Sequence, residues 1–303
     1  MITIDLVIPS FRRPDDLDVA LSHAMAQEVP FHSVIVVARR GDDETVRVAE
    51  KHGLAAVVVD EPGVLAAMHA GVRASSAEIV AFTDDDARVS PQHSKILEAA
   101  FAGDSTRAGV GGPDALYDGS QRRNATTTRR VGQLTWWGRL IGNHHRGDNV
   151  TCDVVVLKGV NAAYRRRLLR LPSGLRGQGA QPHFEVAIGT DLRARGYRLL
   201  YTSDLVVRHH PAPRRDEDDR LAPSATALAD SAYNLERSIP RHLMTRRLIY
   251  VTLIGDANVP GIGRLFVALL RREWSLWQRF VPAWRGTYDA WRERNQPMVF
   301  LGE

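Results

Sequence analysis

The stretch EIVAFTDDDARV (residues 78–89) decides how the N-terminal part of the chain is interpreted. It begins as a short, β-rich apolar run and continues with three consecutive aspartates, Asp84, Asp85 and Asp86. Ligands of an open parallel sheet bind beyond the carboxyl ends of its strands, which is where these aspartates are expected to lie. Because side chains alternate along an extended chain, Asp84 and Asp86 would point to the same side.

Two interpretations of the aspartates are open. Two carboxylates that face one point are poor neighbours unless a cation joins them, and hard oxygen ligands with open positions favour Mg²⁺ or Mn²⁺ bound to phosphate. The alternative is a solvated turn before a helix capped by Ser90, with Pro91 at its first position. The position at a strand end favours the metal site. A phosphatase of the D-x-D-x-T/V type is disfavoured, because the second residue after Asp86 is Arg88.

Apolar runs and helix-like segments alternate over the first hundred residues. The apolar runs are nearly continuous, which is typical of strands buried on both faces of a parallel sheet. Prolines and acids in the first turns of the intervening segments favour helices. This order predicts an open, mostly parallel α/β sheet flanked by helices. The expected strands are residues 3–9, 33–38, 55–60 and 78–83, and the expected helices are residues 13–28, 42–53, 62–75 and 90–101.

The pattern is less regular after residue 101. Residues 112–150, rich in Gly, Asn, Thr and Arg, predict a long functional insertion. The prolines and charges of residues 211–220 predict a boundary between a domain over 1–211 and a helical C-terminal extension over 212–303. Between these segments we expect strands at residues 153–159, 197–202 and 204–210, a short helix at 161–170 and a longer helix at 183–196.

The composition limits the classes of function. The net charge of +5 comes from arginines spread over many segments, and no zinc-finger spacing or RNA-recognition signature is present, so nucleic-acid binding is not expected. Cys152 is the only cysteine, which excludes an internal disulfide and favours a reducing compartment such as the cytoplasm. Neither a secretory signal pattern nor an apolar run of about 18 residues is found, so no spanning helix is expected.

Four segments resemble, in order and spacing, the family 2 glycosyltransferases of the GT-A fold. They are VIPSFRRPDDL (7–17), GVLAAMHAGVRASSAEIVAFTDDDA (63–87), LKGVNAAYRRRLL (157–169) and HFEVAIGTDLRARGYRLLYTSDLVVRHH (183–210). The resemblance extends over residues 3–210. It implies a GT-A-type sheet and a metal-dependent, inverting glycosyltransferase that moves a sugar from a nucleotide-sugar donor to an acceptor hydroxyl.

The resemblance also implies a metal site. Asp84 and Asp86 match the family's D-x-D pair, with Asp86 on the divalent cation, Mn²⁺ or Mg²⁺, and Asp84 on the ribose or the metal. His209, in the family's V-x-H block, would complete the metal site, and His210 is the alternative. The cation would neutralise the charge that develops on the departing nucleoside diphosphate.

Donor-binding residues follow from the same resemblance. Pro9, Phe11 and Arg13 would line the nucleotide, and Asp85 is grouped with them without a role of its own. Many relatives hold the nucleobase with an aspartate after the second strand, where this chain has Ala38. The donor nucleotide therefore stays open among UDP, GDP and dTDP.

The candidate catalytic base is Glu185. It lies eleven residues before Gly196, where the family carries an acid, and Asp191 is the second candidate. A carboxylate there could take the proton of an attacking acceptor hydroxyl. The alternative is an ordinary surface glutamate in the first turn of a helix.

The acceptor is expected to be a carbohydrate, a lipid-linked molecule or a small molecule. Asn161 and His183 are candidate acceptor contacts, although a lone histidine is more often structural. Trp136 and Trp137 could stack on a sugar ring or fill the core beneath a long loop.

Residues 221–303 lie outside the resemblance. Their tryptophans alternate with arginines at helical spacing, which suits either packing against the catalytic domain or a second subunit, or a position on the inner face of a membrane. Packing is the commoner outcome. Two further functions are therefore kept: a non-catalytic nucleotide- or sugar-binding module, and a membrane- or partner-docking scaffold. The tryptophans are Trp274, Trp277, Trp284 and Trp291.

Overall fold

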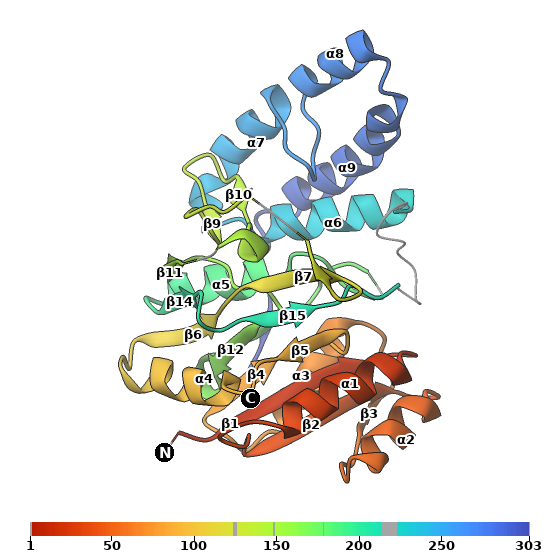
Figure 1. Cartoon of the computed structure of the whole chain (residues 1–303). Helices are drawn as coiled ribbons and strands as arrows, with labels where there is room; N and C mark the ends of the chain where they lie inside the picture. Colours follow the sequence, from red (N-terminus) through yellow and green to blue (C-terminus); the bar gives the residue numbers. More distant parts are fainter. Residues whose placement is uncertain (1, 124–125, 148, 178, 214–222, 303) are drawn as a thin grey trace.

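The computed structural model describes residues 2–123, 126–147, 149–177, 179–213 and 223–302 (Figure 1). Its centre is one twisted sheet of eight strands. In spatial order the strands are β11 (Thr151–Val154), β14 (Arg198–Thr202), β6 (Arg107–Gly111), β12 (Ala162–Arg165), β4 (Ile79–Phe82), β1 (Ile4–Ser10), β2 (Ser33–Arg39) and β3 (Val57–Val59).

The sheet is mostly parallel, as the alternation of apolar and helical segments predicts. Strands β3, β2, β1 and β4 run parallel to one another, and so do β6 and β14. Strand β12 is antiparallel to both of its neighbours, and β11 is antiparallel to β14. The C-terminal ends of β1 and β4 therefore open at the same edge, which is where Asp84 to Asp86 follow β4.

Helices cover both faces of the sheet. The successive residues of β1 alternate between two cores: Val7 packs with α3 (Val64–Ala74) and α5 (Phe184–Ala194), whereas Leu6 and Ile8 pack with helices on the other face. This burial on both faces explains the continuous hydrophobicity of the strand. The helices of the second face are α1 (Pro14–Met25), α2 (Asp43–Lys51) and α4 (His93–Ala102).

Two local predictions are wrong. Helix α4 begins at His93 with Gln92 before it, so Ser90 is not its N-cap. Residues 161–170 do not form a helix but strand β12 and the 3₁₀ turn η2 (Arg166–Leu168). Between β4 and β6 this segment gains a ladder of backbone hydrogen bonds on both sides, which outweighs the helix preference of its Ala, Arg and Leu residues.

The predicted insertion contributes β7 (Asp114–Asp118) and β8 (Gln121–Arg122) to a smaller four-stranded sheet, whose other two strands come from residues 87–89 and 207–209. The sheet has the order β5 (Ala87–Val89), β15 (Val207–His209), β7 and β8. The antiparallel pairing of β5 with β15 brings the end of the aspartate stretch beside His209, although the two are far apart in sequence. Residues 133–146 add the hairpin β9 (Gln133–Leu134) and β10 (Leu140–Ile141) and the 3₁₀ turn η1 (His144–Arg146).

The C-terminal residues are helical, as predicted. Helix α6 packs against both α5 and α9, and Figure 1 shows α7 and α8 reaching away from the large sheet. The chain then returns, because β16 (Phe300–Leu301) pairs with β13 (Leu171–Pro172). The helices are α6 (Ala225–Ser238), α7 (Met244–Leu253), α8 (Ile262–Arg271) and α9 (Trp274–Arg292), with the 3₁₀ turn η3 (Arg241–Leu243).

The predicted boundary between 1–211 and 212–303 stays a prediction, because residues 214–222 lie outside the described part of the chain. Among the described helices, none combines the length and the apolar content needed to cross a bilayer.

Candidate active site

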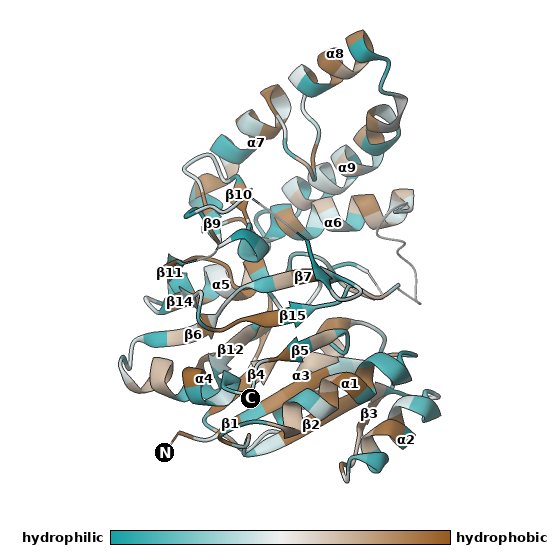
Figure 2. Ribbon diagram, in the orientation of Figure 1, coloured by the Kyte–Doolittle hydropathy of each residue, from teal (hydrophilic) through white to brown (hydrophobic). Residues whose placement is uncertain are grey.

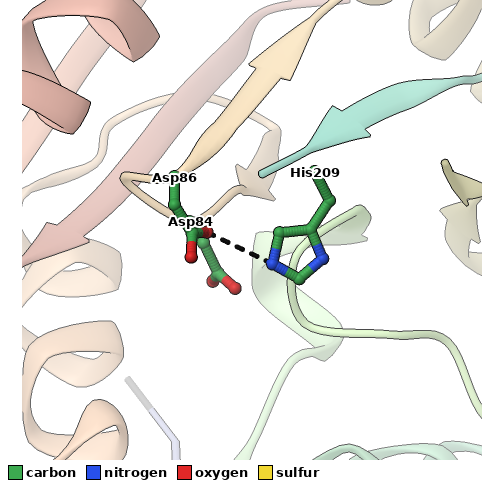
Figure 3. A group of neighbouring side chains, drawn as sticks. All are labelled: Asp84, Asp86 and His209. Atoms are coloured by element: carbon green, nitrogen blue, oxygen red, sulfur yellow. Dashed lines mark ion pairs between the residues drawn. The ribbon is translucent and has the colours of Figure 1, made fainter. Parts of the chain in front are cut away.

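Three side chains converge beyond the end of β4 (Figure 3). Asp84 and Asp86 follow that strand, and His209 is the last residue of β15. One ligand atom from each of the three lies within 4.8 Å of the others. Asp84 and Asp86 lie together as predicted, but through a turn rather than an extended chain, because the Ala87 amide donates to the Asp84 carbonyl at 3.2 Å. The second sheet adds the histidine.

Asp86 is held by groups around it. The Ala212 amide donates to Asp86 Oδ2 at 2.8 Å, and Arg13 Nη1 lies 3.7 Å from the same oxygen. His209 Nε2 lies 3.3 Å from Asp86 Oδ1. Burial alone would raise the pKa of Asp86, but His209, the Ala212 amide and Arg13 together hold this pKa below its ordinary value.

His209 lies between two carboxylates. Its Nδ1 is 3.7 Å from Asp114 Oδ2, and its Nε2 faces Asp86. Burial opposes the charged ring, but the two acids outweigh burial and raise the pKa of His209 to about 9.

The donor chemistry of this cluster fits a divalent cation. Among the described residues, Asp86 Oδ1 and both ring nitrogens of His209 are buried without a hydrogen-bond partner. Buried polar atoms normally have partners, so these atoms are poised for a ligand outside the chain. Two carboxylates and one imidazole, which must lose its ring proton to become a ligand, suit Mn²⁺ or Mg²⁺, which would also take phosphate oxygens.

Asp85 is not one of these three residues, but it lines the cavity beside them and shares Arg13 with Asp86. Ser10 Oγ donates to its Oδ2 at 2.9 Å, and Arg13 Nη1 donates to its Oδ1 at 2.8 Å. Burial raises the pKa of Asp85 to about 7, although the Arg13 charge opposes the shift. The middle aspartate thus fixes the turn after β1 and orients Arg13.

A cavity of about 490 Å³ adjoins the cluster. Pro9, Phe11 and Arg13, the residues expected to line the nucleotide, all lie in its wall, together with Asp84 and His209. Arg39, at the end of β2, places its guanidinium 5.1 Å from the centre of the Phe11 ring. The wall therefore combines an aromatic ring with cationic groups, a pairing suited to a nucleobase and a diphosphate.

Glu185 lines the same cavity from the first turn of α5. The Gly159 amide lies 3.4 Å from its Oε1, and burial raises its pKa, although Gly159 and Lys158 oppose the shift. Position 159 requires a glycine, because a Cβ there would lie 2.8 Å from the Phe184 ring. The loop after β11 thus approaches α5 closely enough to contact the glutamate.

His183 precedes α5 with φ of 71° and also lines the cavity. Its Nε2 lies 3.2 Å from Ser231 Oγ of α6, so a C-terminal helix contacts this residue of the wall. Burial lowers the pKa of His183 to about 4, which keeps the ring neutral at pH 7.

The structure places the other acceptor candidates elsewhere. Asn161 is buried, and its amide nitrogen donates to the carbonyls of Pro113 at 3.1 Å and Leu205 at 2.6 Å. Trp136 and Trp137 lie at the turn of the β9–β10 hairpin and are 59% and 43% exposed. None of the three lines the cavity, and their acceptor roles stay predictions. Asp191, the second base candidate, is paired with Arg170 and Arg195.

Sequence reasoning gave no role to Lys158, Asp114 and Arg39. Lys158 lines the cavity and forms an ion pair with Asp114, which is fully buried at the start of β7. That pair and His209 hold the pKa of Asp114 at about 2 despite its burial. The sequence signal for Lys158 was its position directly before Gly159. Its ion pair with Asp114 could not be predicted, because the two residues are 44 positions apart.

Comparisons with known proteins agree with this geometry. The family described as Glycosyltransferase like family 2 matches residues 3–223. No curated protein matches the chain in sequence.

Three solved structures illustrate the likeness of fold. S. aureus TarS (residues 1–349) in complex with UDP-GlcNAc has a TM-score of 0.57 at 14% identity, over 81% of this chain and 71% of that one. The mannosyltransferase PcManGT from Pyrobaculum calidifontis with GDP-Man and Mn²⁺ has a TM-score of 0.52 at 16% identity, over 97% and 87%. Glucosyl-3-phosphoglycerate synthase from Mycobacterium tuberculosis, with Mn²⁺, UDP-glucose and phosphoglyceric acid, has a TM-score of 0.50 at 20% identity, over 79% and 81%.

At these identities the solved structures establish the fold, and the family match covers most of the chain. Asp84 and Asp86, which fit a D-x-D motif, lie beyond the carboxyl end of a central strand. This chain belongs to the family 2 glycosyltransferases and has the GT-A fold.

Proposed function

We propose that this protein transfers a hexosyl group from a nucleotide-sugar donor to an acceptor hydroxyl, with inversion and with the help of a divalent cation. One observation supports the proposal most strongly. Asp84 and His209 belong to a set of three residues that could hold a cation, and both also line the cavity that Glu185 lines. The candidate metal ligands and the candidate base would thus share one nucleotide-sized cavity.

Each group has a distinct task in this proposal. Asp84, Asp86 and His209 would hold Mn²⁺ or Mg²⁺, which when bound neutralises the charge on the nucleoside diphosphate that leaves. Phe11 offers a ring for the nucleobase, and Arg13, fixed by Asp85, offers a charge to the diphosphate.

Glu185 would accept the proton of the acceptor hydroxyl as that oxygen attacks the anomeric carbon. Its raised pKa suits a base that must take a proton near neutral pH. Attack by an acceptor opposite the leaving diphosphate gives inversion in one displacement. Lys158, beside Glu185 and Asp114, would keep the local charge in balance.

The donor is proposed to carry UDP, GDP or dTDP, and the acceptor to be a carbohydrate, a lipid-linked molecule or a small molecule. The similar solved structures contain either a UDP-sugar or GDP-mannose, so they do not select one nucleotide. The single cysteine, Cys152, is free, which is consistent with a cytoplasmic location.

The test is a donor screen with mass detection of the transferred sugar, run on the wild type and on Glu185→Gln. The glutamine keeps an oxygen for the Gly159 amide but cannot take a proton, so turnover should fall by about 100-fold or more while donor affinity is unchanged. Asp153→Asn, at an exposed ion pair, serves as the matched control.

Two other outcomes separate the competing functions. Donor binding without turnover for any sugar would favour a nucleotide-binding module that has lost catalysis. Unchanged turnover in Glu185→Gln would show that another group, such as Asp191, takes the proton.

A further inference from the structure

The end of the molecule formed by α7 and α8 exposes a contiguous apolar surface, which we call the apolar tip. Figure 2 shows brown segments among teal and white ones in α7 and α8, at the end far from the large sheet. The side chains of the apolar tip are between 55% and 69% exposed. They are Leu253, Ile254, Ile262, Phe266, Leu269 and Leu270.

Helical spacing explains the stripe. Residues 262, 266, 269 and 270 fall on one side of α8, whereas Leu265 and Ala268 face the neighbouring helices and are buried. Helix α8 therefore has apolar residues on two sides, and the described part of the chain covers only one of them.

The end of α7 extends this surface. A Cβ at Gly263 would lie 2.9 Å from the Leu253 carbonyl, and a Cβ at Gly261 would lie 2.6 Å from the backbone of Ile254. The backbone at Leu253 and Ile254 thus lies against the start of α8, and both side chains are exposed beside it. Monomeric proteins rarely leave such a contiguous apolar surface without a partner.

The charges around the apolar tip are mostly of one sign. Residues 244–292 contain eight arginines and three acids. Arg247 is buried with Glu236 and Asp256, but Arg264, Arg271 and Arg272 on and beside α8 are exposed.

This charge pattern selects the partner. A second copy docked tip to tip would bring arginines against arginines, since Glu273 is the one acid in the segment 261–273. An anionic bilayer surface satisfies both features, because its acyl boundary covers the apolar stripe and its phosphates attract arginine. We propose that the apolar tip docks this enzyme peripherally on a membrane surface rich in anionic lipids.

The test is a flotation assay with the full-length protein. Vesicles of phosphatidylcholine alone are compared with vesicles that contain phosphatidylglycerol as well, at low and at high salt. The wild type should bind the anionic vesicles about tenfold better than the neutral ones and should lose much of that preference at high salt.

Two variants and one control define the surface. Leu269→Gln/Leu270→Gln should reduce vesicle binding about tenfold or more, because it removes two apolar side chains from the lipid contact. Arg264→Gln/Arg271→Gln should remove the preference for anionic lipid. Met25→Gln, a 52% exposed apolar position on α1, should change neither property. Thermal melting should match the wild type in all three, since the residues are exposed.

Two results would overturn the proposal. The first is a wild type that stays off anionic vesicles at low salt, or that binds them as well after Leu269→Gln/Leu270→Gln. The second is a concentration-dependent dimer in sedimentation velocity that this variant abolishes, which would make a second copy the partner. Manganese-dependent binding of a nucleoside diphosphate, measured on the same samples, reports on the active site separately.

Discussion

Arg247→Met should strongly destabilise the C-terminal helices. Arg247 is 1% exposed, and its guanidinium donates to Glu236 Oε1 at 2.6 Å and 2.8 Å and to Asp256 Oδ2 at 2.6 Å. Glu236 belongs to α6 and Asp256 follows α7, so one side chain connects three segments. Burial raises the pKa of Glu236, whereas Arg247 outweighs burial at Asp256 and holds that pKa below its ordinary value.

The magnitude follows from what the substitution leaves behind. Methionine fills a similar space but leaves two carboxylates buried together without a cation. Removing one partner of a buried ion pair costs about 3–5 kcal/mol in the free energy of unfolding. Arg198→Gln, which breaks exposed pairs with Asp153 and Asp104, is the control and should leave this free energy nearly unchanged.

The deficit should depend on pH. In the wild type, the pKa of Asp256 is lower in the folded than in the unfolded protein. Asp256 therefore stabilises the fold at any pH above its unfolded-state pKa, and this stabilisation is lost as the pH falls through the folded-state pKa. In Arg247→Met the unpaired carboxylates gain raised pKa values, so protonation relieves them as the pH falls. The difference between wild type and variant should therefore shrink from pH 7.5 to pH 4.5.

Urea denaturation followed by circular dichroism at both pH values measures this difference. A loss below about 1 kcal/mol at pH 7.5, or a deficit that grows on acidification, would show that the carboxylates do not depend on Arg247 in this way.

Three further predictions concern other parts of the chain. Gly189→Ala should lower the melting temperature and slow transfer. The alanine Cβ would lie 1.9 Å from the Val155 carbonyl oxygen and would push α5, which carries Glu185, out of place. Unchanged melting and unchanged turnover would contradict this. His93→Leu should lose less stability in acid than the wild type. Burial lowers the His93 pKa from 6.5 to about 3, so keeping this ring neutral in the fold costs the wild type about 1.4 kcal/mol per pH unit below 6.5. An equal loss of unfolding free energy with falling pH in the two proteins, measured by urea denaturation, would argue against this. The kcat/KM profile should rise with pH through the raised pKa of Glu185, and this limb should vanish in Glu185→Gln, whereas a limb that persists belongs to another group.

The first half of the fold could be predicted because its signals are local. Strands β1, β2 and β4 are continuous apolar runs, and α1 and α2 begin with acids, so period and capping suffice. The aspartates after β4 could be assigned to a site for the same reason, since the edge of a parallel sheet gathers strand ends.

The remainder depends on partners that sequence periodicity does not report. Strand β12 has the composition of a helix and is a strand only because β4 and β6 lie on either side of it. Lys158 pairs with Asp114, whose position depends on the pairing of β7 in the second sheet. That sheet forms from short strands of separate segments, which show no clear period. Trp136 and Trp137 carry large apolar surface, yet the turn of the hairpin leaves them exposed.

The most direct test of the proposed metal site is calorimetric titration of nucleoside diphosphates with and without Mn²⁺. Wild-type protein should bind one of UDP, GDP or dTDP in a manganese-dependent manner. Asp86→Asn keeps an oxygen for the Ala212 amide but removes the charge, so it should weaken that binding by about 100-fold or more, whereas Asp153→Asn should not. Binding that is equally tight without Mn²⁺, or unchanged in Asp86→Asn, would contradict a metal-dependent donor site at Asp84, Asp86 and His209.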